Sequence, residues 1–318
     1  MPKYPKIICS ALLIITFLLG IFFWSGCSKK EATVSPGKES LQFPLTVQDD
    51  LGRKVQITKK PERIVSLSPS NTEILFALGL DKQIVGVTKY CDYPLEALKK
   101  PKVGGFADPG LELIVNAKPD LVLAGSIHKE LIHRLEELNI PVIALEPKSI
   151  EQVLEKILLV GKATGANEKA QNLVESLTKQ INEVEAKVKN LPEDKKSRVF
   201  FELYQDPLTT IGGKSYIHDL LTAAGGKNIS GSLKQEWLTY NTEQILAQNP
   251  EVIIFVRMHG SKQMIEQVKK RPNWQNISAV KNNRVYYLSN ENIVLRPGPR
   301  LGEGLKTLAG MIHPDIFK

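Results

Sequence analysis

The residue types that most often carry catalysis or bind metals are scattered along this chain. Its histidines form no motif with metal-ligand spacing; they are His128, His133, His218, His259 and His313. The segment Gly213-Lys214-Ser215 resembles the end of a phosphate-binding loop, but that motif needs a glycine where the chain has Leu208. Neither G-x-S-x-G nor H-E-x-x-H occurs. We therefore expect no catalytic site, no resident cofactor and no protein-held metal.

Two single residues could still contact the metal of a bound ligand. His128 follows a predicted strand and could coordinate such a metal, or it could be a solvated loop histidine. Cys91 could also reach a ligand metal, although a buried and inert thiol is the simpler expectation. Because Cys9 and Cys27 belong to the N-terminal segment, the body of the chain has one cysteine and no internal disulfide.

Aromatic and arginine side chains in loops are better candidates for binding chemistry. Tyr90 follows a predicted strand in VTKYCDYP, Phe106 lies in the glycine-rich VGGFADPG, and Trp237 lies in KQEWLTY. Each could pack on a flat ligand, or it could be a core residue. Arg296 and Arg300 flank a Pro-Gly-Pro turn and could meet an anionic group of a ligand, or they could bind carbonyls beneath their own loop. Arg300 opens a predicted helix, so we expect it to be structural.

One unit of glutamate, helix, proline and strand occurs twice in the chain. The segments PGLELIVNAKPDLVLAG and NTEQILAQNPEVIIFV align at an offset of 131 residues, which places Glu112 on Glu243. A glutamate in the first turn of a helix complements the helix dipole. The repetition also suggests one contact surface on each of two lobes.

The patterns between these residues predict strands alternating with helices. We expect a hairpin at 45–58 and strands at 64–67, 84–88, 120–125, 141–145, 198–204, 251–256 and 284–289. A helix is expected to open from the polar turn 68–72 and to stop at Gly79, and others are expected at 128–139, 216–226 and near 261–270. This alternation is typical of crossover connections and parallel sheets.

A helical region separates the two halves of this pattern. Residues 149–165 and 167–190 have helical periodicity, and the second has an apolar stripe at positions 173, 177, 181, 184 and 188. The sequence therefore predicts an N-terminal lobe over 44–148, linking helices over 149–192 and a C-terminal lobe over 193–318. A long helix between two lobes would limit how far they can swing.

The N-terminus reads as a targeting segment. Lys3 and Lys6 precede the apolar run 7–24, and Ser25-Gly26-Cys27 follows it. This order is similar to a bacterial lipoprotein signal over 1–26 with Cys27 as the lipidated residue, although Trp24 stands where leucine is usual; an uncleaved single-span anchor is the alternative. The polar stretch 27–43 is expected to be a flexible tether. Either interpretation places the body outside the cytoplasm, attached to a membrane.

Charge and composition argue against two other classes of protein. The chain is 42% hydrophobic and 24% charged, which disfavours extensive disorder. Its net charge of +8 is mild for its length, and its lysines lie on amphipathic helices rather than beside aromatic residues. We therefore expect no binding to nucleic acid.

Taken together, the motifs resemble the substrate-binding proteins of bacterial ABC importers for cobalamin, siderophores and haem. The resemblance covers residues 44–316 and rests on RIVSLSPSNTEILFALGL, VGVTKYCDYP, LELIVNAKPDLVLA, SIEQV, GGKNI, TEQILAQNPEVII and RPGPRLGEGL. It is most similar to the cobalamin branch. The resemblance implies an α/β fold with two βα-sandwich lobes, mostly parallel sheets, one long rigid helix between them and a ligand cleft between the lobes.

The resemblance also implies roles for named residues. Tyr90, Phe106 and Trp237 match ligand-contacting aromatic positions, and Asn292 falls on a further ligand position. Arg296 stays a ligand-binding candidate from its own chemistry. Phe106 stands where the pattern has tryptophan, Gly125 where it has another tryptophan, and Asn292 where it has aspartate. Glu112 and Glu243 match the glutamates that meet arginines of the permease dimer.

The implied function is capture and delivery of cobalamin or a related corrinoid by a monomer that catalyses no reaction. A ferric siderophore or haem as cargo is the first alternative, which a basic cleft around Lys89, Arg257 and Arg296 would favour. A metal-chelatase-like enzyme on tetrapyrroles and a structural envelope lipoprotein are more remote alternatives.

Overall fold

The computed structural model describes residues 42–256 and 263–317. The chain divides into a unit of residues 1–40 and a unit of residues 41–318, and only the second is described. The predicted signal segment, Cys27, most of the tether, Arg257 and His259 thus lie outside the described residues. None of the described helices is long and apolar enough to cross a membrane.

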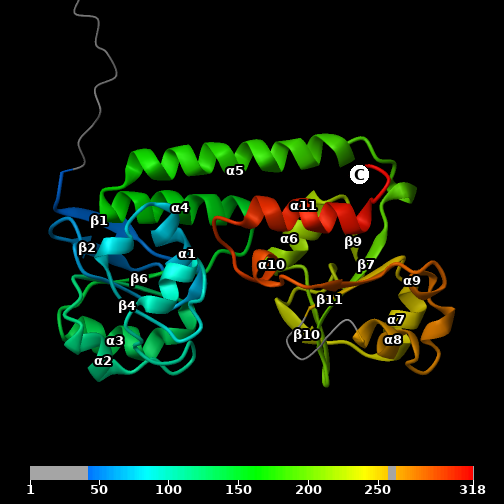
Figure 1. Ribbon diagram of the computed structural model, residues 1–318, viewed down its shortest axis with the longest axis horizontal. Coiled ribbons are helices and arrows are strands. Elements are labelled where there is room, and N and C mark those ends of the chain that lie inside the picture. Colours follow the sequence, from blue (N-terminus) through cyan, green and yellow to red (C-terminus); the bar gives the residue numbers. More distant parts are fainter. Residues whose placement is uncertain (1–41, 257–262, 318) are drawn as a thin grey trace, which may run out of the picture. The chain divides into compact units, whose positions relative to one another are not determined.

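The first lobe is built on a four-stranded parallel sheet in the order β4-β3-β5-β6 (Figure 1). Its strands are β3 (Ile64–Ser66), β4 (Ile84–Val87), β5 (Leu121–Ala124) and β6 (Val142–Ala144). Its helices are α1 (Pro69–Ala77), α2 (Leu111–Asn116) and α3 (Lys129–Glu137). The predicted hairpin is present as β1 (Leu45–Gln48) and β2 (Lys54–Ile57), which pair antiparallel. We call these elements the N-terminal lobe.

The second lobe has a mixed sheet, whose main order is β10-β8-β7-β11-β12, with β9 paired to β7. Its strands are β7 (Arg198–Gln205), β8 (Leu208–Ile211), β9 (Lys227–Asn228), β10 (Trp237–Thr239), β11 (Val252–Val256) and β12 (Val285–Leu288). Its helices are α6 (Tyr216–Ala223), α7 (Thr242–Gln248), α8 (Met264–Lys269), α9 (Ser278–Lys281), α10 (Asn292–Leu295) and α11 (Leu301–Ile312). β8 and β10 are antiparallel to their neighbours and were not expected from the sequence. We call these elements the C-terminal lobe.

Short 3₁₀ turns complete both lobes. They are Asp81–Gln83, Leu95–Lys99, Ser126–His128, Glu193–Lys195 and Trp274–Asn276.

The central strands of the two larger sheets are buried on both faces, which explains their nearly continuous apolar runs. In β5, Leu121 and Leu123 enter one core cluster, while Val122 and Ala124 enter a second cluster with α2 and α3. β7 and β11 alternate in the same way between the first cluster and a third cluster beneath α7, α8 and α9. The buried polar exception in β7 is Glu202, whose carboxylate accepts from Arg271 at 2.6 and 2.7 Å.

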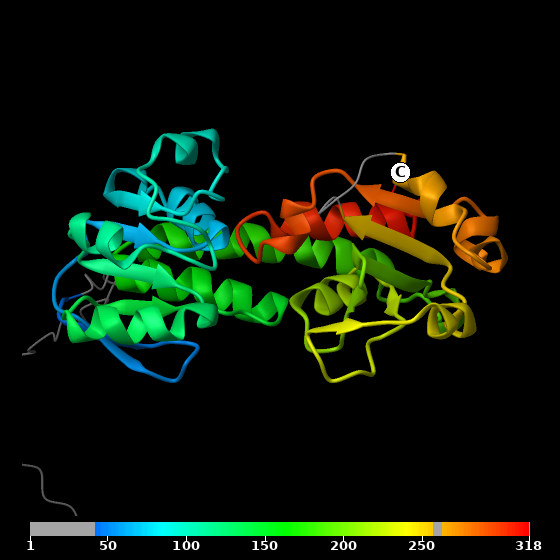
Figure 2. The same cartoon turned by 90° about the horizontal axis from the view of Figure 1, so that it is seen from below.

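One long helix, α5 (Asn167–Val188), extends along both lobes, as predicted, while α4 (Ile150–Thr164) lies beside the N-terminal lobe and α11 beside the C-terminal lobe (Figure 1, Figure 2). α4 contacts α1 and β1 in the N-terminal lobe and α6 in the C-terminal lobe. α5 packs on α4, α6 and α11, and the predicted apolar stripe faces this contact. A single core cluster includes residues of both sheets and both helices, so movement of one lobe on the other would disturb a shared core.

A close approach of α4 to α5 depends on one glycine. An added Cβ on Gly161 would lie 2.3 Å from Cβ of Ala170. Glycine at this position therefore lets the two helix backbones meet without a side chain between them.

The proposed residue limits of the two lobes, at 148 and 193, stay predictions.

Candidate functional site

The aromatic candidates of the N-terminal lobe lie beyond the carboxyl ends of its parallel strands, where ligands of open α/β sheets bind. Tyr90 follows β4 and is 52% exposed, and Phe106 is 37% exposed in the loop that precedes α2. Both side chains are thus too exposed to be core residues. Tyr93, which the sequence reading did not select, is 46% exposed beside them.

Gly104 and Gly105 shape the loop that carries Phe106. Gly104 has φ +112°, a region that side chains other than glycine rarely adopt, and its Cβ position would lie 2.8 Å from the Gly110 nitrogen. A Cβ on Gly105 would overlap the carboxylate of Asp108. The glycines are therefore required by a tight backbone turn, which presents Phe106 to solvent.

His128 holds this loop and is not the solvated residue that one interpretation expected. It is 3% exposed, its Nδ1 accepts from the Gly125 backbone nitrogen at 3.0 Å, and its Nε2 lies 2.6 Å from the Phe106 carbonyl oxygen. Because Nδ1 accepts, the proton must be on Nε2, which donates to Phe106. Both ring nitrogens are thus occupied within the protein. The ring also packs edge-on against Phe106, with 5.6 Å between ring centroids.

Cys91 is buried, as expected for an inert thiol. Its sulfur receives a hydrogen bond from Thr72 Oγ1 at 3.1 Å and lies 3.3 Å from Thr88 Oγ1.

The two arginines around the Pro-Gly-Pro turn meet in the N-terminal lobe at Glu73 of α1. Arg300 donates to both Glu73 oxygens, at 2.8 and 2.6 Å, and Arg296 donates to one of them at 3.0 Å. Glu73 is 2% exposed, so its charge is compensated inside the protein. The sequence reading missed Glu73; its one signal was a carboxylate directly before the apolar run Ile74–Ala77 of α1.

Arg296 also holds the loop of Tyr90. Its guanidinium donates to the Asp92 carboxylate at 2.6 Å and to the Tyr90 carbonyl at 3.4 Å. Burial by itself lowers the pKa of Arg296, but the bonds to Asp92 and Glu73 outweigh this and raise it. This geometry fits the structural interpretation of Arg296, since its donors are directed at protein acceptors. The guanidinium of Arg300 lies 4.1 Å from the ring centroid of Tyr93, a cation–π contact.

Trp237 lies on β10, at the edge of the C-terminal sheet, and is 49% exposed. Its neighbour Glu236 forms an ion pair across the lobes with Lys148, which precedes α4; the distances are 2.9 and 2.8 Å. Lys148 also pairs with Glu146. Trp237 therefore adjoins a contact between the lobes, as Tyr90 does through Arg296.

Burial, hydrogen bonds and charge all act on the pKa values of Glu146 and Lys148. Burial by itself raises the pKa of Glu146, but bonds from Lys148 and Ser126 and the charge of Lys148 leave it below its usual value. Burial likewise lowers the pKa of Lys148, and its bonds to Glu146 and Glu236 raise it on balance. Both groups therefore stay charged at neutral pH.

Asn292 begins α10 and is half-buried; its carbonyl accepts from the Arg296 backbone nitrogen at 3.2 Å. It thus lies on the same segment as Arg296, four residues earlier. Among the described residues its side chain has no hydrogen bond to the aromatic candidates. The ligand-binding role of Asn292 therefore stays a prediction.

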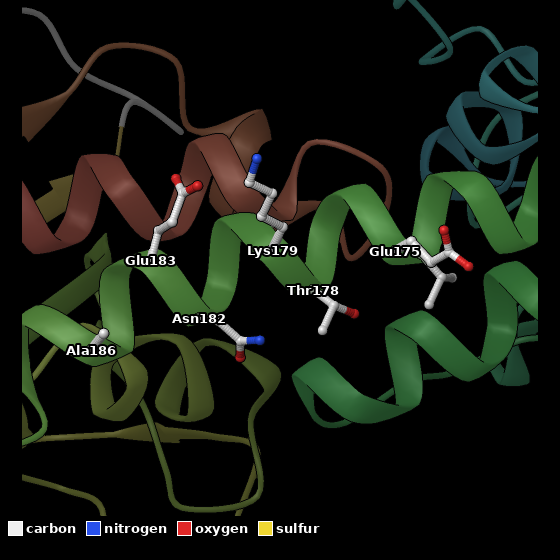
Figure 3. A pocket seen from close by; sticks show the side chains of 7 residues that line it. Glu175, Thr178, Lys179, Asn182, Glu183 and Ala186 are labelled. Atoms are coloured by element: carbon white, nitrogen blue, oxygen red, sulfur yellow. The ribbon is translucent and has the colours of Figure 1, made fainter.

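A cavity and a groove in the described part of the chain are lined by residues other than the candidate aromatics. A cavity of about 260 Å³ lies at the carboxyl ends of β7 and β11, lined by Glu202, Leu203, Tyr204, Gln205, Asp206, Val256 and Met264. A shallow groove of about 600 Å³ follows α5, where Lys179 and Glu183 point to one side and Thr178 and Asn182 to the other (Figure 3). The groove has no aromatic side chain on which a flat ligand could stack. Among residues 42–256 and 263–317, no group of three His, Cys, Asp or Glu could hold a metal ion.

Glu112 and Glu243 occupy equivalent places in the two lobes. Each lies in the first turn of its helix, α2 or α7, and each is exposed. Neither carboxylate has an ion-pair or hydrogen-bond partner among the described residues. Figure 1 shows both helices on the side of the unit away from α5. Two free charges on one side are available to an external partner.

Comparison with known proteins agrees with this architecture. Residues 64–291 match the family described as periplasmic binding protein. The chain is 36% identical to the ABC transporter substrate-binding lipoprotein YvrC of Bacillus subtilis, over 98% of both chains. It is 37% identical to the vitamin B12-binding protein of Salmonella paratyphi A, over 64% of this chain and 76% of that one. A possible iron-binding periplasmic protein of Staphylococcus epidermidis superposes with a TM-score of 0.71 at 31% identity, covering 80% of this chain and all of that one.

Proposed function

This chain belongs to the family of periplasmic binding proteins as the substrate-binding component of an ABC importer, and we propose that its cargo is cobalamin or a related corrinoid. The observation that carries the proposal is the set of exposed aromatic side chains Tyr90, Phe106 and Trp237. The charged side chains of the neighbouring Arg296 cluster neutralise one another in ion pairs. A corrinoid has a broad apolar face and an amide rim, which suit aromatic walls rather than fixed charge.

The charge around Arg296 supports a corrinoid over an anionic siderophore. Arg296 and Arg300 are balanced by Glu73 and Asp92, so this cluster has no net charge to offer a carboxylate or phosphate. Lys89 lies over the Tyr90 ring, 5.3 Å from its centroid.

In this proposal the cargo lies between the Tyr90 and Phe106 loops of one lobe and Trp237 of the other. Asn292 begins α10, the short helix that ends directly before Arg296, and its side-chain amide would bond the amide rim of the corrinoid. Arg296 contributes by holding the Tyr90 loop. The chain itself makes and breaks no covalent bond in the delivery of its cargo.

Delivery requires docking on the permease, for which we propose Glu112 and Glu243. A permease made of two paired subunits presents one surface twice, and a glutamate on each lobe matches that repetition. Charge-assisted pairs with arginines of the permease would orient the two proteins and accelerate their encounter.

The family and the relatives place the body outside the cytoplasm, and we propose that a lipid on Cys27 attaches it to the membrane. A relative over nearly the whole chain is named a lipoprotein, and a small-small-Cys triplet closes the apolar N-terminal run. Mass spectrometry of the membrane-extracted protein tests this: a mature N-terminus at an acylated Cys27 is expected, and an intact residue 1–26 segment would refute it.

Titration calorimetry tests the cargo. The mature chain is titrated with cyanocobalamin, cobinamide, hemin and ferric siderophores, and saturable 1:1 binding of the corrinoids is expected. The Trp237→Ala variant should bind cyanocobalamin about 10- to 100-fold more weakly, because a stacked aromatic contributes roughly 1.5–3 kcal/mol. Leu138→Ala, which removes another exposed apolar side chain on the N-terminal lobe, should change the affinity less than twofold.

Two results would change the assignment. If hemin or a siderophore binds and neither corrinoid does, the cargo is an iron complex, as the name of the Staphylococcus epidermidis neighbour suggests. If Trp237→Ala binds cyanocobalamin as tightly as the wild type, the proposed binding surface is wrong even if the cargo is right.

A further inference from the structure

The repeated glutamate helices end in the same way, through an arginine that is not part of the sequence repeat. In the N-terminal lobe, Arg63 Nε donates to the carbonyl oxygens of Ala117 at 3.2 Å and Lys118 at 3.0 Å. Its Nη2 donates to Ala117 as well, at 2.7 Å. These carbonyls belong to the C-terminal end of α2, the helix of Glu112.

In the C-terminal lobe, Arg198 does the same for α7, the helix of Glu243. Its Nε donates to the carbonyl oxygens of Gln248 at 3.1 Å and Asn249 at 3.2 Å, and its Nη2 donates to Asn249 at 3.1 Å. Gln248 and Asn249 stand at the same offset from Ala117 and Lys118 as Glu243 stands from Glu112. The two arginines therefore bind equivalent carbonyls.

An acidic residue holds each arginine in place. The Asp120 carboxylate accepts from the Arg63 backbone nitrogen at 2.9 Å, and the Glu251 carboxylate accepts from the Arg198 backbone nitrogen at 2.9 Å. In return, the backbone nitrogens of Asp120 and Glu251 donate to the Arg63 and Arg198 carbonyls, at 2.9 and 2.8 Å. Each arginine thus links the start of a core strand to the end of a glutamate helix.

The backbone between helix and strand has the same unusual conformation in both lobes. Lys118 has φ +47° and Asn249 has φ +43°, in the left-handed region. Residues other than glycine disfavour this conformation, lysine more than asparagine. In both lobes the carbonyl of this residue is a hydrogen-bond acceptor of the arginine, which stabilises this otherwise unfavourable turn.

The helices are too short to keep their direction unaided. α2 has six residues and α7 has seven, well below the length at which an isolated helix is stable. Each buries one isoleucine completely, Ile114 or Ile245, near its middle. Partly buried side chains add to this packing, Leu111 and Val115 in α2 and Leu246 in α7. The arginine adds a directional attachment at the C-terminal end, which together with the packing defines the direction of the first turn.

We propose that Arg63 and Arg198 are positioning residues, which orient Glu112 and Glu243 for the permease without touching it. The proposal rests on the docking function proposed above. The arginines also compensate the negative end of each helix dipole, while the glutamates lie at the positive end. Both effects favour a fixed helix with its carboxylate free for the partner.

A double-mutant cycle tests the proposal. The permease–ATPase complex of the importer is held in lipid nanodiscs on a biolayer-interferometry sensor, and the mature chain and its variants are the analytes. Arg63→Met should weaken docking about five- to tenfold in the wild-type background and less than twofold in the Glu112→Gln background, because residues that act together are not additive. Arg198→Met should behave in the same way with Glu243→Gln.

Cargo binding and a matched variant separate positioning from general loss of structure. Cyanocobalamin affinity should stay within twofold in each arginine variant, since the aromatic candidates lie on other segments. Arg134→Met removes an exposed arginine of α3 in the same lobe and should leave docking unchanged. Arg63→Lys should restore docking in part, because a lysine can reach a carbonyl but lacks the planar fork of donors.

The outcomes distinguish the two proposals. If Glu112→Gln and Glu243→Gln leave docking unchanged, the docking function is wrong and the positioning role falls with it. If the glutamate variants dock weakly but Arg63→Met docks as the wild type does, or loses the same factor in both backgrounds, only the positioning role is overturned.

Discussion

Replacing Glu73 with glutamine should show how strongly its ion pairs hold the two lobes together. The Glu73 side chain is 1% exposed and accepts three hydrogen bonds from Arg296 and Arg300, whose side chains are 12% and 11% exposed. Glutamine has nearly the same shape but no charge. The substitution therefore leaves the arginines in place and removes the buried carboxylate that compensates them.

The expected loss is about 3 kcal/mol in the free energy of unfolding. Removing one partner of a buried ion pair costs roughly 3–5 kcal/mol, and the lower end applies because Arg296 keeps its bond to Asp92. For a folded unit of this size, that loss corresponds to a fall in Tm of about 6–12 °C.

Urea denaturation followed by far-ultraviolet circular dichroism measures this loss. Glu130→Gln is the control, because Glu130 is an exposed glutamate on α3, and it should change the unfolding free energy by less than about 0.5 kcal/mol. If Glu73→Gln costs no more than the control, the ion pairs of Glu73 contribute no more than a surface pair. Our account of how the Tyr90 loop is held would then be wrong.

Two further substitutions test the pH dependence of stability and the packing of the linking helices. Burial lowers the pKa of His218, and the charge of Asp219 offsets this only in part, so the unfolded chain binds the proton more tightly. Stability should therefore fall as pH drops from 7.5 through the ordinary histidine pKa of about 6.5. His218→Gln should have a smaller slope of unfolding free energy between pH 7.5 and 5, and equal slopes would contradict the assignment. Gly161→Ala should cost about 1–3 kcal/mol by forcing α4 from α5 at Ala170, as measured by thermal unfolding; an unchanged Tm would show that the helices can separate freely.

Local patterns in the sequence determined most of the secondary structure. Continuous apolar runs predicted β5, β7 and β11, because a strand buried on both faces has no polar alternation. The same patterns did not predict β8 and β10. These strands have four and three residues with mixed polarity, and they exist because they pair with β7 and with each other.

The candidate site was only partly accessible to the same reasoning. Tyr90, Phe106 and Trp237 were selected from their loops, and they are exposed, but Trp237 proved to lie on an edge strand. The prediction of a ligand cleft between the lobes remains a prediction.

The sequence by itself determined the repeated glutamate helices, the linking helices and the family of the chain, because these depend on residues close together along the chain. Only the tertiary structure decided that Arg296 and Arg300 meet Glu73, more than 200 positions earlier, and that Arg63 and Arg198 cap the two glutamate helices. An arginine has the same sequence pattern whether it binds a ligand, a carboxylate or a helix end. Its partner is chosen by which segments the packed core brings within hydrogen-bond distance.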